Sequence, residues 1–147
     1  MEVLVLATQK GGAGKSTLAF HLAVAAEAKG LGPVALVDTD PQGTLLKWWN
    51  TRKSDTPKMA QSEVVTLPKT VSELRKAGVR LAIVDTPGRF SEATDMVIRA
   101  ATFVLLPLKP SAGDLWALGA TVESCKKVRK SFAFVVNQAV RGAALTV

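Results

Sequence analysis

A glycine-rich loop close to Met1 limits the possible folds of this chain more than any other feature. The run Lys10–Thr17 reads KGGAGKST and follows the apolar segment Val3–Ala7. Residues of helical composition then continue from Gly14 to Lys29. A strand, a glycine-rich turn and a helix in this order bring backbone N–H groups and the positive end of the helix dipole to one point. We therefore predict a loop that binds phosphate groups.

The residues of this loop have separate predicted roles. Lys15 is placed to reach the outer phosphates, and the Ser16 hydroxyl is a magnesium ligand. Thr17 follows and contacts the inner phosphate or the helix. Gln9 stands where the strict form of the motif has its first glycine, but a second lysine, Lys10, makes the run more specific than the generic pattern. The predicted nucleotide-binding residues of the loop are Gly11, Gly12, Ala13, Gly14, Lys15, Ser16 and Thr17.

A second motif supplies an acid that organises a metal ion. The apolar segment Leu81–Val84 ends in Asp85, which fits the metal-organising position that phosphate loops require at a neighbouring strand end. The turn that follows consists of Thr86, Pro87 and Gly88, and a glycine N–H there is suited to sensing a terminal phosphate. We predict a nucleotide-dependent switch at this turn.

Two further acids follow the segment Val34–Val37. Asp38 and Asp40 belong to the run DTDPQG, at the carboxyl edge where open α/β sheets bind ligands. Asp40 is predicted to orient or deprotonate an attacking water, while Asp38 holds the water shell of magnesium or the loop itself. An Asp-Pro turn with a capping carboxylate is the structural alternative. The predicted metal-site residues are Ser16, Asp38 and Asp85.

The order of apolar and helical segments predicts the fold class. With 147 residues the chain fits one domain, residues 1–147. Nearly continuous apolar strands that alternate with helices predict a three-layer α/β/α domain with a mainly parallel sheet. The predicted strands are Val3–Ala7, Val34–Val37, Val64–Leu67, Leu81–Val84, Phe103–Leu106 and Phe132–Val136. The predicted helices are Gly14–Lys29, Val71–Ala77, Glu92–Ala100 and Asp114–Lys130.

Composition narrows the classes of partner and compartment. Lys and Arg outnumber Asp and Glu by 19 to 12, which favours polyanionic partners. Cys125 is the one cysteine, so an intramolecular disulfide is excluded and a cytoplasmic protein is expected. The residues after Phe132–Val136 are too few for another helix–strand unit, so we predict a domain that is short at its C-terminus.

The three loop motifs together resemble the ParA/MinD family of P-loop ATPases with a deviant Walker A loop. The resemblance rests on KGGAGKST, DTDPQG and VDTPG, which occur in the family's order, and it covers essentially the whole chain. The segments Pro107–Trp116 and Val136–Gln138 look like the small ParA-type partition proteins in particular. A phosphate loop that begins almost at Met1 leaves no N-terminal helix-turn-helix, as in the short ParA form.

This resemblance implies roles for three residues. Lys10 would be the signature lysine that crosses a nucleotide-sandwich homodimer to contact the partner's phosphates, and Asp40 the residue needed for hydrolysis. A cation supplied by a second copy stabilises transition-state charge, so hydrolysis would wait for dimerisation. The catalytic residues are then Lys10, Lys15 and Asp40. Asn137 would contact adenine, or alternatively cap a turn.

The functional expectation is a ParA-like ATPase of plasmid or chromosome partition that uses ATP and Mg²⁺. Its ATP-bound homodimer would bind DNA nonspecifically on the nucleoid, and a centromere-binding ParB-like protein would stimulate hydrolysis. No membrane partner is expected, because Ala139–Val147 lacks a basic amphipathic helix. Two alternatives stay open: a nucleotide-binding regulatory module without turnover, and another P-loop enzyme such as a dethiobiotin-synthetase-like ligase, in which Lys10 serves a substrate.

Overall fold

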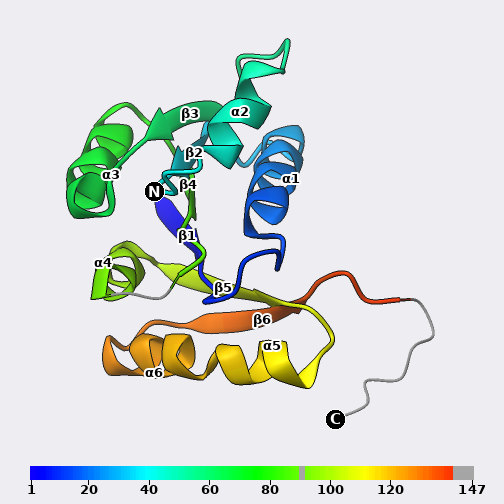
Figure 1. Cartoon of the computed structure of the whole chain (residues 1–147). Helices are drawn as coiled ribbons and strands as arrows, with labels where there is room; N and C mark the ends of the chain where they lie inside the picture. The colour runs from blue at the N-terminus through cyan, green and yellow to red at the C-terminus, as the bar shows by residue number, and fades with distance from the viewer. Residues whose placement is uncertain (90–91, 141–147) are drawn as a thin grey trace.

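A six-stranded parallel sheet forms the centre of the molecule (Figure 1). The computed structural model describes residues 1–89 and 92–140. Neighbouring strands follow the order β3-β2-β4-β1-β5-β6, and every pair is parallel. This confirms the predicted fold class. The strands are β1 (Glu2–Leu6), β2 (Val34–Asp38), β3 (Lys58–Gln61), β4 (Leu81–Asp85), β5 (Phe103–Leu108) and β6 (Phe132–Val136).

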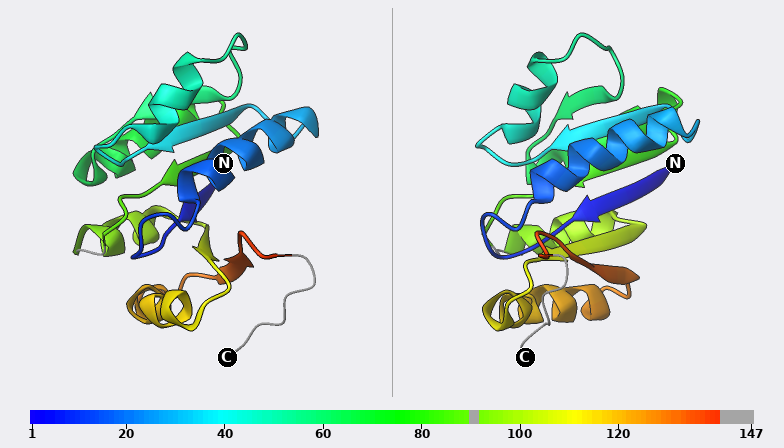
Figure 2. Two further views of the ribbon diagram at one scale, coloured as in Figure 1. Left: turned by 45° about the vertical axis from the view of Figure 1, so that its right-hand side comes forward. Right: turned by 90° about the vertical axis from the view of Figure 1, so that its right-hand side faces the viewer.

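Helices cover both faces of the sheet, as Figures 1 and 2 show. One layer contains α1 and α2, and the other contains α3, α4 and α6, while the short α5 precedes α6. No helix within the described residues is long and apolar enough to cross a membrane. The helices are α1 (Lys15–Ala28), α2 (Thr44–Asn50), α3 (Leu67–Lys76), α4 (Glu92–Ala100), α5 (Ala112–Ala117) and α6 (Gly119–Lys127), with a 3₁₀ turn, η1, at Val64–Thr66.

Two apolar clusters join these layers to the sheet. Under α1, the small side chains Ala19, Ala23 and Ala26 lie in one cluster with Leu36 of β2 and Ile83 of β4. Their spacing of three and four residues puts all three alanines on one face of the helix, which lets the helix backbone lie close to the sheet. On the opposite face, residues of β1, β4 and β5 pack against α3, α4 and α6. The start of α1 is thereby fixed over the end of β1.

The predicted strand at Val64–Leu67 is wrong. The third strand lies earlier, at Lys58–Gln61, and pairs with β2 from Ala35↔Lys58 to Asp38↔Gln61. Because β3 is at the edge of the sheet, its side chains are exposed or partly exposed, and its backbone pairing with β2 needs no continuous apolar run. Pro68 sits in the first turn of α3, where its missing N–H costs no helix hydrogen bond, so the apolar residues before it lead into a helix.

The predicted helix Asp114–Lys130 is also incorrect as a single element. It is two helices, α5 and α6, which are separated at Leu118. Gly119, the first residue of α6, has a low helix propensity, and the buried Leu118 side chain anchors the join to the core. As a result the segment bends, and α5 extends back toward the loop that follows β5.

The register of the sheet places the predicted acids together. Leu6 at the end of β1 lies opposite Asp85 at the end of β4, and Asp38 at the end of β2 lies opposite Asp85 from the other side. Adjacent strands are about 4.8 Å apart, so these strand ends share one small area at the carboxyl edge. The glycine-rich loop leaves β1 at this same edge.

Candidate functional site

The loop between β1 and α1 has the backbone geometry of an anion cradle. Gly12 and Gly14 adopt the left-handed conformation, with φ of 80° and 87°, which glycine reaches without steric cost. A Cβ at Gly11 would meet nothing within 4 Å, so the concave side of the loop is open there. Helix α1 begins at Lys15, directly after the loop, and its N-terminal N–H groups are available to an anion.

Lys15 is the cation at the base of this cradle. Only 7% of the residue is exposed, and this burial is the main cause that lowers the pKa of its ammonium group. The carboxylates of Asp85 and Asp40 act in the opposite direction and raise that pKa. The structure therefore brings all three predicted residues within electrostatic reach of one another. A desolvated ammonium group attracts a phosphate more strongly than an exposed one.

Asp85 is paired with Ser16 across the site. The Ser16 hydroxyl donates to Asp85 Oδ2 at 2.5 Å. The other carboxylate oxygen, Oδ1, is buried and has no hydrogen-bond partner among the described residues. Burial raises the pKa of Asp85 to about 6, against the smaller effects of Ser16 and Lys15, which lower it. A buried oxygen acceptor without a donor is suited to coordinate a metal ion, or to accept a hydrogen bond from a water molecule that is bound to the ion.

Asp38 organises the loop after β2. Its Oδ1 accepts the N–H of Asp40 at 3.0 Å, and its Oδ2 accepts those of Leu45 and Leu46 in α2, at 3.1 and 3.3 Å. Burial is the main cause that raises the pKa of this carboxyl group. Of the two alternatives stated for Asp38, the geometry supports the one in which it holds the loop, and a role toward magnesium stays a prediction.

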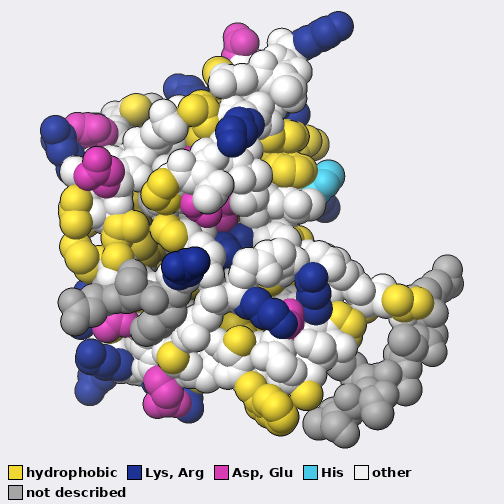
Figure 3. Space-filling model, viewed as in Figure 1, with side chains coloured by type: hydrophobic (Ala, Val, Ile, Leu, Met, Phe, Trp, Pro, Cys, Tyr) yellow, Lys and Arg dark blue, Asp and Glu magenta, His cyan; other side chains and the backbone are white. Residues whose placement is uncertain are grey.

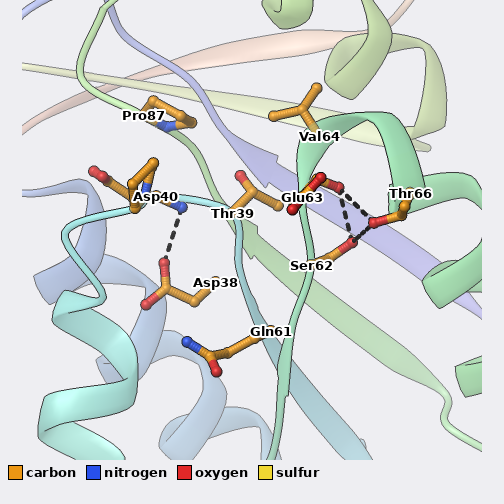
Figure 4. A pocket seen from close by; sticks show the side chains of 10 residues that line it. Asp38, Thr39, Asp40, Gln61, Ser62, Glu63, Val64, Thr66 and Pro87 are labelled. Atoms are coloured by element: carbon orange, nitrogen blue, oxygen red, sulfur yellow. Dashed lines mark hydrogen bonds between the residues drawn. The ribbon is translucent and has the colours of Figure 1, made fainter.

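Asp40 and an open pocket lie on the outer side of this loop. The Asp40 carboxylate is half-buried and accepts the N–H of Gln42 at 2.9 Å. The pocket has a volume of about 700 Å³ and extends from the loop after β2 to the segment after β3 (Figure 4). Glu63 and Pro87 line it as well, so it connects the acidic loop with the predicted switch turn. No group of three or more Asp, Glu, His or Cys side chains in the described ranges forms a metal site by itself.

The switch turn contacts the phosphate loop. Thr86 is buried and donates to the backbone oxygen of Leu6 at 2.8 Å, which ties the end of β4 to the end of β1. A Cβ at Gly88 would lie 3.7 Å from the Cα of Gly11 and 3.9 Å from Lys15 Nζ. The turn Thr86, Pro87 and Gly88 is therefore close enough to respond to whatever occupies the cradle.

The chain after β6 returns to the outer wall of the loop. Asn137 donates its side-chain amide to the backbone oxygen of Ala13 at 3.1 Å, and Gln138 donates to that of Gly12 at 3.2 Å. The predicted adenine contact of Asn137 stays a prediction. The predicted absence of an amphipathic helix in Ala139–Val147 concerns residues of which 141–147 lie outside the described ranges.

A comparison with family models decides the family. Residues 4–146 match the model described as the CobQ/CobB/MinD/ParA nucleotide binding domain. The chain belongs to this family.

Curated members of the ParA/MinD family include two that illustrate its range. The chain is 32% identical to the maintenance of carboxysome distribution protein A of Halothiobacillus neapolitanus, over 97% of this chain and 69% of that protein. It is 37% identical to Protein ParA of Rhizobium radiobacter, over 78% of this chain and 51% of that protein. The chain thus spans about two thirds of the first relative and about half of the second.

Solved structures of the ParA/MinD family share the fold. The septum site-determining protein MinD of Pyrococcus horikoshii, complexed with Mg-ADP, superposes with a TM-score of 0.76 over 96% of this chain and 72% of that one. The sequence identity between the two is 17%, so this likeness concerns the fold alone.

No role was predicted for three residues that lie near the loop of this ParA/MinD-family domain: Lys109, Asp114 and Gln138. Lys10 forms an ion pair with Asp114 of α5 at 2.6 Å, and the ammonium of Lys109 would lie 3.7 Å from a Cβ at Gly12. Gln138 contacts the loop, as described above. Lys109, Asp114 and Gln138 all lie in the segments Pro107–Trp116 and Val136–Gln138, on which the family resemblance partly rests, and this was the signal that the sequence offered. Their contacts depend on the tertiary approach of β5, α5 and β6.

Replacing Gly14 by Ala is expected to lower the free energy of unfolding by about 2–3 kcal/mol. The left-handed backbone there costs an alanine about 1–2 kcal/mol, and the new Cβ would overlap the side-chain amide of Asn137, which then loses its hydrogen bond to Ala13. Gly30→Ala is the matched control, since Gly30 has a φ of 72° and open space around its Cβ position. Urea denaturation measures the free energy of unfolding of both variants. An equal loss in the two would show that the Asn137 contact does not contribute to stability.

Proposed function

We propose that this chain is the nucleotide-switch domain of a ParA-type positioning ATPase. Its ATP-bound form pairs with a second copy and binds DNA nonspecifically, and slow hydrolysis of ATP to ADP and phosphate resets it. One observation carries the proposal: the glycine-rich cradle, buried Lys15 and the Ser16–Asp85 pair converge at a single sheet edge. Membership of the family and the nucleotide in the solved MinD structure support it.

ATP and Mg²⁺ fit the residues of this site. Backbone N–H groups of residues 11–17 and the ammonium of Lys15 would hold the phosphates, as such loops do. Ser16 Oγ and the orphaned Asp85 Oδ1 are hard oxygen donors, which magnesium prefers. The bound metal would neutralise charge that develops on the phosphates. Nothing else among the described residues satisfies Asp85 Oδ1.

Hydrolysis in this proposal depends on Asp40 and on a second protomer. Asp40 lies on the open side of the site and orients the attacking water, while Lys10 of the second copy adds positive charge at the phosphates. Gly88, next to Gly11 and Lys15, reports whether the terminal phosphate is present. The turn Thr86–Gly88 then transmits the nucleotide state to the surface around the pocket.

Charge and relatives support the proposed partners. The net charge of +7 favours a polyanion such as nucleoid DNA, and Lys and Arg side chains are spread across the face in Figure 3. The relatives' names refer to a probable plasmid-partitioning protein, ParA of Thermus thermophilus, and to a protein of carboxysome distribution, so the cargo class is either DNA or a large protein assembly. A ParB-like adaptor in the cytoplasm would stimulate hydrolysis for either cargo.

The mass of the protein with and without ATP and magnesium tests this proposal. We expect a dimer for the parent chain with ATP, and a monomer for Lys10→Ala under the same conditions. The ammonium group of Lys10 pairs with Asp114 in its own protomer, so we expect Lys10→Ala to bind ATP with nearly parental affinity. Light scattering gives the mass, and calorimetry gives the affinity. A dimer of Lys10→Ala, or no ATP binding by the parent chain, would contradict the proposal.

DNA binding and turnover are measured separately in the same preparation. We expect an ATP-dependent mobility shift of DNA that weakens steeply with salt, because phosphate contacts release counterions. ATP binding without phosphate release would identify the regulatory module instead. Turnover stimulated by a small metabolite, and not by DNA with a protein partner, would identify a ligase-like enzyme.

A further inference from the structure

Among the described residues, one ion pair involves the phosphate loop. It joins Lys10 to Asp114, a buried acid of α5. Lys10 Nζ lies 2.6 Å from Asp114 Oδ1, and the two residues are 104 positions apart in the sequence. The Lys10 side chain is 56% exposed, while that of Asp114 is only 4% exposed. The acid is therefore fixed by the fold, and the lysine reaches it from the surface.

Hydrogen bonds with the segment between β5 and α5 hold Asp114 in place. Its Oδ2 accepts the N–H of Lys109 at 2.9 Å, and its own N–H donates to the Ser111 hydroxyl at 3.1 Å. The hydrogen bond from Lys10, together with the one from Lys109, keeps the pKa of Asp114 below its ordinary value. The carboxyl group is thus ionised at neutral pH and offers one oxygen to the β5–α5 loop and the other to Lys10.

We propose that Asp114 holds Lys10 within its own protomer when nucleotide is absent, and that this ion pair opposes ATP-dependent pairing of two copies. The inference rests on the proposed function, in which Lys10 contacts the phosphates of the second copy. Asp114 is buried and is fixed within its own protomer by Lys109 and Ser111, so it cannot move outward with the Lys10 side chain. A Lys10 side chain that extends to the phosphates of a second copy would therefore leave Asp114, and each protomer would break its pair as the sandwich closes.

The size of this effect follows from the exposure of Lys10. An ion pair with one solvent-exposed partner contributes little, and two such pairs break in a symmetric dimer. We therefore expect removal of the pair to lower the protein concentration for half-maximal dimerisation with ATP by roughly three- to tenfold.

Asp114→Asn is the variant that tests the proposal. The amide oxygen still accepts the N–H of Lys109, so the loop is retained, but the negative charge beside Lys10 is gone. The dimerisation midpoint is measured by light scattering with ATPγS and magnesium, which avoids turnover. Asp95→Asn is the matched control, since it also removes the acid of an ion pair, with Lys127 at 3.5 Å, and this pair does not involve the phosphate loop. We expect a lower midpoint for Asp114→Asn and an unchanged one for Asp95→Asn.

A second measurement does not depend on dimerisation. The rate of reductive methylation of Lys10 in the nucleotide-free monomer is followed by mass spectrometry, with the exposed Lys47 as internal reference. Release from Asp114 should raise the Lys10 rate at least about twofold in Asp114→Asn relative to Lys47. Thermal melts show whether each variant is folded.

The outcomes separate the two proposals. An unchanged or higher midpoint for folded Asp114→Asn overturns the opposing role of the ion pair, and an unchanged methylation rate overturns the pair itself. If the parent chain binds ATPγS but never dimerises, the proposed function fails, and with it the inference, although the methylation rates still decide whether Asp114 holds Lys10. If Asp114→Asn does not fold, the parent chain is methylated at low and at high salt instead. Salt screens the ion pair, so Lys10 should be methylated faster relative to Lys47 at high salt, and an unchanged ratio would overturn the pair.

Discussion

Replacing Lys15 by Met is expected to lower the affinity for ATP at least about a hundredfold. The ammonium group would make hydrogen bonds with anionic phosphate oxygens, and each such bond contributes about 1.5–3 kcal/mol. Two of them amount to about 3 kcal/mol or more, which is the stated loss in affinity. Methionine keeps most of the buried stem of Lys15, so the loop should stay folded. Isothermal calorimetry with ATP and magnesium measures the effect.

Lys47→Met is the control for this prediction. Lys47 is an exposed lysine of α2, so its replacement removes one positive charge without touching the loop. We expect its ATP affinity to stay within about twofold of the parent chain. A Lys15→Met variant that binds ATP as tightly as Lys47→Met would mean that the cradle does not hold the phosphates, and the candidate site would be lost with it.

Asp85→Asn is expected to stabilise the nucleotide-free protein at neutral pH. Burial raises the pKa of Asp85 from 3.8 to about 6, so the folded state favours the protonated form. A carboxyl group with a raised pKa contributes its stability fully below about pH 4 and loses it as the pH rises through about 6. At about pH 7.5 the buried charge therefore costs up to about 3 kcal/mol, which an uncharged asparagine avoids.

Chemical denaturation at several pH values checks this prediction. The difference between Asp85→Asn and the parent chain should grow from near zero at about pH 4 to its full size above about pH 7. Asp55→Asn, in an exposed loop, should show no such pH dependence. Magnesium and ATP should reverse the order, because they stabilise only the parent chain through Asp85. A stability difference that does not change with pH would contradict the burial effect.

The geometry of the site explains why this cost is retained. Asp85 Oδ1 is buried next to Ser16 and Lys15 and has no donor among the described residues, so the free protein is destabilised at the point where a metal ion would be held. A surface carboxylate would cost nothing but would bind magnesium in competition with bulk water. In the proposed function, binding of Mg²⁺ with ATP would offset this cost.

The sequence was sufficient for those features that depend on local pattern. The glycine-rich loop, the strand ends at Asp38 and Asp85, and the start of α1 are specified by residues within a few positions of one another. Glycine conformation, apolar runs and a strand that ends in an acid are local properties. The edge strand Lys58–Gln61 was missed because a strand at the edge is defined by its pairing with β2 and not by its own apolar content.

The amino-acid sequence by itself determined the fold class and the position of the glycine-rich loop between β1 and α1, because short-range patterns specify both. Only the tertiary structure decided that Ser16 donates to one oxygen of Asp85, that the other oxygen has no partner among the described residues, and that Lys10 pairs with Asp114. These contacts join residues that are adjacent through the strand order β2-β4-β1-β5. That order arises from long-range packing of the whole sheet, for which the sequence carries no local signal.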